Sequence, residues 1–182
     1  MPSRPRAAAP RHPAGATSVI SAPAALPRGL RIVAVLAVMA AIAALVSFPL
    51  SDPDLWQHLR IGRALWESHR IEPRNVWTWP TYGEPYLIPS WLFRVLLWPF
   101  WSAGGITGLF VWRWLTTLAC FAMLWAAARA RRGGATGVAA LFALLWCAVL
   151  YRFRSQVRPE TLVAVLLAAQ FWLLESRRAP RP

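Results

Sequence analysis

Long apolar runs separated by short polar segments dominate this sequence. The first run, "GLRIVAVLAVMAAIAALVSFPL" at 29–50, holds roughly 20 apolar residues, the length a helix needs to cross a ~30 Å hydrocarbon core. Further runs cover about 106–128, 135–151 and 159–175. The pattern predicts an all-α, polytopic membrane helix bundle with about four transmembrane helices, in a membrane domain that spans 29–176.

The segment between the first two runs, 51–105, has a different periodicity. Within 54–70 the apolar residues share one helical face and the polar residues cover the other. The apolar face comprises Leu55, Leu59, Gly62 and Trp66, joined by Trp56, Ile61 and Leu65. A second such segment, "SWLFRVLLWPFWSAGG" at 90–105, contains Pro99 and ends at two glycines. Both are too polar or too short to span, so we expect two amphipathic helices lying on the bilayer surface.

The two ends of the chain lack an apolar period. Residues 1–28 are rich in Pro, Ala and Arg and predict a disordered cytoplasmic arm, and 177–182 predict a cytoplasmic tail. The first apolar run could also be a signal peptide. Its length and the absence of a small-x-small cleavage pattern in "LVSF" favour a retained span.

Charge gives the orientation. The chain has 20 basic residues, all of them arginine, and seven acids, for a formal net charge of +13. Arginines cluster at the ends of alternate apolar runs, whereas the arginines of 51–105 are balanced by acids. The positive-inside rule therefore places both termini in the cytoplasm and makes 51–105 an outer loop. Because the arginines form no stripe along one face, the charge does not indicate nucleic-acid binding.

Two aspartates open the outer loop, in "SDPDLWQHL". Asp52 followed by Pro53 is typical of a helix N-cap with proline at the first helical position. Asp54 would then lie in the first turn, where a carboxylate suits the helix dipole. One cap is enough to start the helix, so a chemical role for Asp54 stays open beside the structural one.

Several arginines are placed to meet an anion on the outer side. Arg113 lies inside the second apolar run, where a cation usually faces a polar cavity, although snorkelling to the interface explains it equally well. Arg152, Arg154 and Arg158 occupy the hinge before the last run. Guanidinium groups bind phosphate oxygens bidentately, so these residues suit a phosphate-bearing ligand, with lipid headgroups as the competing partner.

Four motifs together resemble a known family. "DPDLWQHL" (52–59), "HRIEP" (69–73), "SWL" (90–92) and "RPE" (158–160) are similar in order and place to the first loop and following spans of the bacterial GT-C glycosyltransferases. The resemblance implies a multi-pass enzyme of the bacterial plasma (inner) membrane that takes a sugar from a polyprenyl-phosphate donor on the outer face. The family fold has about seven spans or more, so this chain would correspond to its N-terminal portion.

The resemblance also implies residue roles. Asp54 would be the base on the acceptor hydroxyl, with Asp52 as second choice, and His58 would hydrogen-bond the acid or the substrate. Arg113, Arg152, Arg154 and Arg158 would stabilise the departing phosphate. A divalent ion, Mg²⁺ or Mn²⁺, held by Asp52 and Asp54 is an open alternative.

Two other functions compete with the transferase. The first is a non-catalytic multi-span protein that packs with a partner membrane subunit. The second is a small transporter subunit, which the sequence disfavours because no apolar run carries an acid at its middle.

Overall fold

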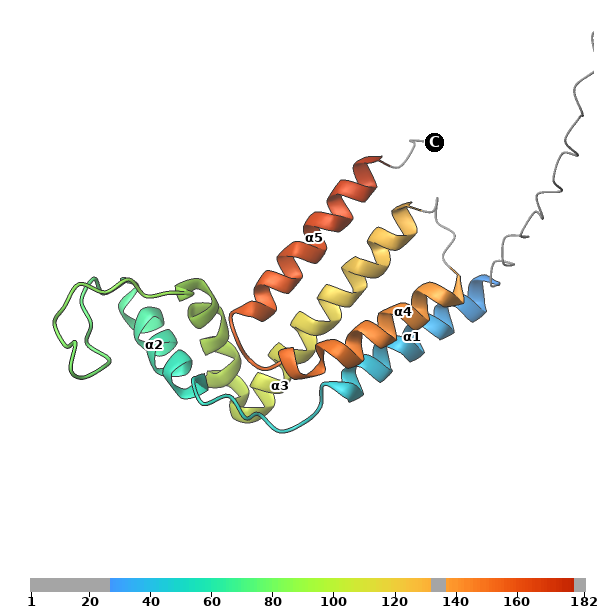
Figure 1. Ribbon diagram of the computed structural model, residues 1–182. Coiled ribbons are helices and arrows are strands. Elements are labelled where there is room, and N and C mark those ends of the chain that lie inside the picture. Colours follow the sequence, from blue (N-terminus) through green and yellow to red (C-terminus); the bar gives the residue numbers. More distant parts are fainter. Residues whose placement is uncertain (1–26, 132–136, 179–182) are drawn as a thin grey trace, which may run out of the picture.

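The computed structural model describes residues 27–131 and 137–178, and this part of the chain is helical with no strand (Figure 1). The helices are α1 (Arg28–Leu45), α2 (Leu55–Ser68), α3 (Trp91–Arg131), α4 (Val138–Tyr151) and α5 (Glu160–Arg178), with a short 3-10 turn, η1 (Arg152–Arg154), before α5. The all-α prediction is confirmed for these residues. The predicted arm up to residue 26 and the predicted tail from residue 179 lie outside them.

Two of the helices, α1 and α3, are long and apolar enough to cross a membrane. The helices at the other two predicted spans are less suited to crossing a membrane, because of their length or charge. α4 has 14 residues, and α5 has 19 residues with Glu160 at its start and Arg177 and Arg178 in its last turn. A membrane location therefore has the support of α1 and α3, whereas the crossing of α4 and α5 stays a prediction.

A break at Gly105 divides α3 into two parts. Gly105 has φ 54° and ψ −130°, a backbone conformation that glycine adopts far more easily than other residues. The first part, 91–104, therefore turns back toward the second part, 106–131, and the two make a V (Figure 1). Gly108 lies so close to the backbone of Phe100 that no side chain fits between them. The break falls where the sequence predicted the end of the second amphipathic helix.

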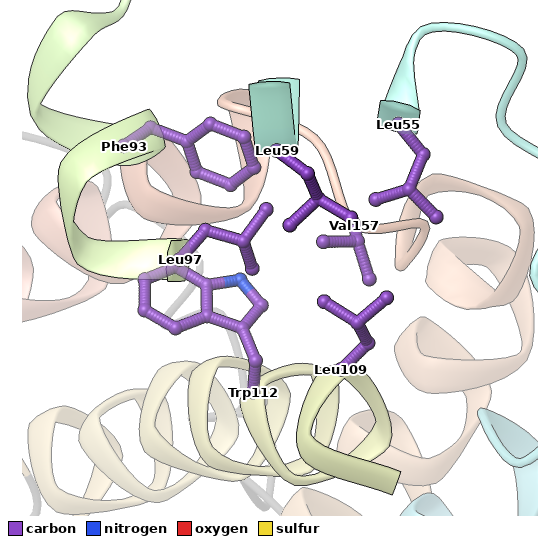
Figure 2. Close-up of a cluster of buried hydrophobic side chains, with 7 residues drawn as sticks. All are labelled: Leu55, Leu59, Phe93, Leu97, Leu109, Trp112 and Val157. Carbon is purple, nitrogen blue, oxygen red and sulfur yellow. The ribbon is translucent and has the colours of Figure 1, made fainter. Parts of the chain in front are cut away.

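Helix α2 packs against both parts of α3. Figure 2 shows the side chains that fill the space between them: Leu55, Leu59, Phe93, Leu97, Leu109, Trp112 and Val157. Gly62 allows α2 to approach the backbone of Arg94. The predicted apolar face is thus buried against protein, except that Trp56 and Trp66 are 61% and 45% exposed.

The other helices pack through apolar side chains. A second cluster joins α1, α3 and α4, and consists of Ile42, Phe121, Trp125, Leu141, Leu144 and Ala148. Helix α5 packs along α3. Large apolar side chains point away from the bundle, among them Leu36, Phe142 and Leu166, which are 64 to 68% exposed. A surface of this kind fits lipid or another protein better than water.

Candidate functional site at the start of α2

Asp52 joins two segments that are distant in the sequence. Its side chain is fully buried and accepts hydrogen bonds from Arg158 Nε to Oδ2 at 2.9 Å and from Arg158 Nη2 to Oδ1 at 3.1 Å. Oδ1 also accepts the backbone N–H of Asp54 at 3.1 Å. The bidentate pair raises the pKa of Arg158, first through its hydrogen bonds and then through the carboxylate charge. Asp52 therefore connects the segment between α1 and α2 to the segment that precedes α5, 106 residues away.

Asp54 differs from Asp52 in being exposed. It is the residue that immediately precedes α2, and its carbonyl accepts the backbone N–H of His58 at 3.0 Å. Among the described residues its carboxylate makes no hydrogen bond or ion pair. The predicted helix start was two residues too early, because Pro53 and Asp54 form a turn and Leu55 begins α2. Asp52 still satisfies the N–H of Asp54, as a capping side chain does.

His58 lies one turn after Asp54, on the buried side of α2. The imidazole is 8% exposed and meets the ring of Phe93 edge-on, with 5.3 Å between the ring centroids. Burial lowers the pKa of His58, the Arg94 cation lowers it further, and the carboxylates of Asp52, Asp54 and Glu160 act in the opposite direction. The ring is therefore neutral at pH 7, and its Nδ1 has no partner within the described part of the chain.

Arg113 is almost completely buried, at 1% exposed, and contacts backbone and amide oxygens. Its Nη1 donates to the carbonyls of Val46 at 2.8 Å and Phe48 at 2.6 Å, and its Nη2 donates to Gln156 Oε1 at 3.1 Å. Its guanidinium also lies over the ring of Phe48, 4.6 Å from the centroid. Arg113 thus holds the end of α1 close to the segment before α5, and its donors face protein rather than a cavity.

The remaining predicted arginines do not surround Asp54 as a ring. Arg152 lies over Phe48 at 5.2 Å and over Phe153 at 5.6 Å, measured from its Cζ to each centroid. Arg154 is exposed. Of the four predicted cations, only Arg158 pairs with a carboxylate among the described residues.

A groove of about 530 Å³ runs between the segment after α1 and the break of α3. Its lining is Ser47, Phe48, Pro49, Leu50, Asp52, Leu55, Trp56, Trp101, Ile106, Leu109 and Phe110. The rings of Trp56 and Trp101 meet edge-on at 5.4 Å. Apart from Asp52, whose carboxylate pairs with Arg158, the lining is mostly apolar, so the groove suits an apolar chain.

The two aspartates do not suit a divalent metal. Both oxygens of Asp52 already accept N–H groups of the Arg158 cation or of the backbone, and a metal ion at this position would meet the positive charge of Arg158. No group of three or more His, Cys, Asp or Glu residues gathers as a metal site within 27–131 and 137–178.

Arg94 is a site residue that the sequence interpretation missed. It is 4% exposed, lies near His58 and Tyr86, and its Nε and Nη1 have no partner in the described structure. The signal was present, because Arg94 is a single cation inside the apolar stretch "SWLFRVLLWPF". Arg113 was selected because it lies inside a predicted span, and this reasoning was not applied to Arg94 because 90–105 was predicted as a surface helix.

Comparison with protein-family models, curated proteins and solved structures gives no match to this chain. A functional assignment therefore depends on the residues of the site and on the motifs they belong to.

Proposed function

We propose that this protein is a membrane glycosyltransferase of the GT-C type, which transfers a sugar from a polyprenyl-phosphate donor to an acceptor hydroxyl. The observation that carries the proposal is that the two aspartates have different environments. Asp52 is buried and paired with Arg158, whereas Asp54 is exposed with a free carboxylate beside that pair. Asp54 is also the residue to which the motif resemblance assigns the base.

The proposed reaction uses Asp54 as general base. Its carboxylate takes the proton of the acceptor hydroxyl while that oxygen bonds to the anomeric carbon, and the bond from this carbon to the donor phosphate oxygen breaks. The leaving phosphate keeps the bonding electrons and gains negative charge, which nearby guanidinium groups stabilise. Arg158, whose side chain is 43% exposed, and the exposed Arg154 are the available cations, because Arg113 is occupied by carbonyl oxygens.

The groove supplies a place for the donor lipid. Its lining is mostly apolar, and its one carboxylate, Asp52, is already paired with Arg158, so a prenyl chain fits its walls. In the proposed topology α1, the second part of α3, α4 and α5 cross the bacterial inner membrane with both termini in the cytoplasm. Helix α2 and the loop 69–90 then lie outside, where polyprenyl-phosphate sugars are used by the family that the motifs resemble.

A second candidate is a non-catalytic membrane protein that packs with a partner subunit. The observation in its favour is the set of exposed apolar side chains on α4 and α5, including Phe142, Trp146, Leu166 and Phe171. A helical partner would cover such faces as well as lipid does.

The test uses membranes that contain the full chain and a short-chain polyprenyl-phosphate hexose with a labelled sugar. Movement of the label from the lipid donor to an acceptor in these membranes is expected for wild type, with a loss of about 10²- to 10⁴-fold in Asp54→Asn, the range for removal of a general base. Glu72→Gln, an exposed acid of the same loop, is the matched control and should keep full activity. Absence of transfer by wild type would favour the partner-subunit function, and full transfer by Asp54→Asn would remove Asp54 from the mechanism.

A further inference from the structure

A second cavity lies between the start of α1 and the end of α3. It has a volume of about 480 Å³, and its lining is Arg28, Arg31, Ile32, Val35, Leu36, Trp125 and Arg129. None of these residues belongs to the groove near Asp52. The cavity is therefore a separate feature, formed by the two helices that are long and apolar enough to cross a membrane.

The polar side of this cavity carries positive charge only. Arg28 and Arg31 come from the first turn of α1, and Arg129 comes from the last turn of α3. Within 27–131 and 137–178 none of the three forms an ion pair, and no acid lines the cavity. Guanidinium groups can contact phosphate oxygens bidentately, so three of them from two helices favour an anionic ligand such as a phosphate group.

The other side of the cavity is apolar. Ile32, Val35 and Leu36 follow the arginines along one face of α1, and Trp125 faces them from α3. Leu36 is 64% exposed, so the apolar wall continues onto the outer surface of the bundle. A ligand that matches both sides has an anionic head and an apolar chain. A tryptophan and arginines at the end of a span are typical of the headgroup level of a bilayer.

We propose that this cavity binds the phosphate of an anionic phospholipid, with one acyl chain lying along Ile32 and Leu36. Basic pockets between transmembrane helices bind anionic headgroups in this way. The site does not depend on the proposed transferase activity, because it shares no residue with the groove or with Asp54.

The test measures lipid retention by the purified full chain in detergent, using native mass spectrometry. Phosphatidylglycerol and phosphatidylcholine are offered in equal amounts, and wild type is expected to keep phosphatidylglycerol selectively. The double variant R31Q/R129Q should lower the affinity for phosphatidylglycerol roughly tenfold or more, because it removes two of the three cations that would attract the anionic headgroup. R31K/R129K should restore part of the affinity, because lysine keeps the charge and loses the bidentate geometry.

R131Q/R177Q is the matched control. It removes the same charge from exposed positions at the ends of α3 and α5 that do not line the cavity. Retention equal to wild type in this control is expected, with unchanged helical circular dichroism in both double variants. Equal losses in the two double variants would show a general charge effect and overturn the site. Equal retention of the two lipids, or competition by soluble glycerol phosphate as strong as that by the lipid, would also overturn it.

Discussion

Two parts of this molecule differ in the contacts that stabilise them. The α2 end is made of α2, the first part of α3 and the segments 46–54 and 155–159. It packs around the apolar cluster of Figure 2 and in addition contains paired buried polar groups, such as Asp52 and the guanidinium of Arg113 that reaches into it. The helical part, made of α1, residues 106–131 of α3, α4 and α5, packs through apolar clusters and exposes apolar side chains. Directional bonds fix the position of the residues that make them, whereas apolar faces accept several partners of the right shape. The candidate site lies in the end where positions are fixed.

The largest expected effect comes from Arg113, which connects the two parts. Arg113→Met removes all three of its side-chain hydrogen bonds and leaves the buried oxygen of Val46 and the partly buried oxygens of Phe48 and Gln156 without this donor. Unfolding should become easier by about 4 kcal/mol, measured by denaturant titration in detergent micelles. Arg154→Met, at an exposed position, is the control and should change stability by less than about 0.5 kcal/mol. Equal effects in the two variants would mean that the Arg113 bonds do not hold the parts together.

The next largest loss of stability is expected where the two parts of α3 approach each other. Gly108→Ala places a methyl group against the backbone carbonyl of Phe100, which cannot move aside as a side chain does. We expect a loss of about 3 kcal/mol from this overlap. Gly104→Ala is the control, because nothing lies near its added methyl group, and it should leave stability unchanged or raise it by up to about 1 kcal/mol. A Gly108→Ala protein as stable as wild type would contradict the V shape of α3.

The two aspartates give a matched pair within the α2 end. Asp52→Asn weakens the bonds to Arg158 and should cost about 2 kcal/mol, less than for a fully buried pair because Arg158 is partly exposed to solvent. Asp54→Asn should leave the thermal midpoint unchanged, since its carboxylate is exposed. Thermal melts followed by circular dichroism compare the two. If Asp54→Asn were the less stable variant, Asp54 would be the structural residue and Asp52 would be the candidate base.

A smaller effect should appear as pH dependence at the α2 end. The pKa of His58 is lowered in the folded protein, so the unfolded chain binds this proton more readily. The stability that comes from neutral His58 is therefore complete above the unfolded pKa of about 6.5 and is lost as the pH falls below it. Denaturation curves at several pH values should show that acid pH lowers the stability of His58→Phe less than that of wild type. His69→Asn, at an exposed position, is the control and should behave as wild type. If the stability of His58→Phe depended on pH as strongly as that of wild type, His58 would not be the cause of the acid loss.

The smallest effect is expected on the outer face of the helical part. Phe142 is 68% exposed on α4, so Phe142→Ala should cost less than about 0.5 kcal/mol in detergent. Its neighbour Leu141 is 4% exposed, and Leu141→Ala should cost clearly more. A loss in Phe142→Ala that equals the loss in Leu141→Ala would show that protein covers this face, and would favour the partner-subunit function.

The sequence was sufficient for the local elements. The first apolar run predicted 29–50 and the structure has α1 at Arg28–Leu45, and the amphipathic period of 54–70 predicted α2 at Leu55–Ser68. The glycines at 104 and 105 marked the break of α3. Each of these features depends on a repeat or a residue type within one turn or a few turns of helix, which is visible in the letters themselves.

The sequence was not sufficient for the contacts between distant residues. It grouped Arg113, Arg152, Arg154 and Arg158 by their predicted side of the membrane, and it could not show that only Arg158 meets a carboxylate. It also gave no reason to expect that Arg113 binds carbonyl oxygens of the chain. Such pairings depend on how helices pack, and packing is set by side chains that no local period brings together.

The bond between Asp52 and Arg158 has a consequence for how the protein is made. A ribosome synthesises the carboxylate 106 residues before its guanidinium. Until residue 158 is made, the Asp52 carboxylate lacks the partner that it has in the folded protein. The α2 end therefore reaches its final form only after Arg158 has left the ribosome.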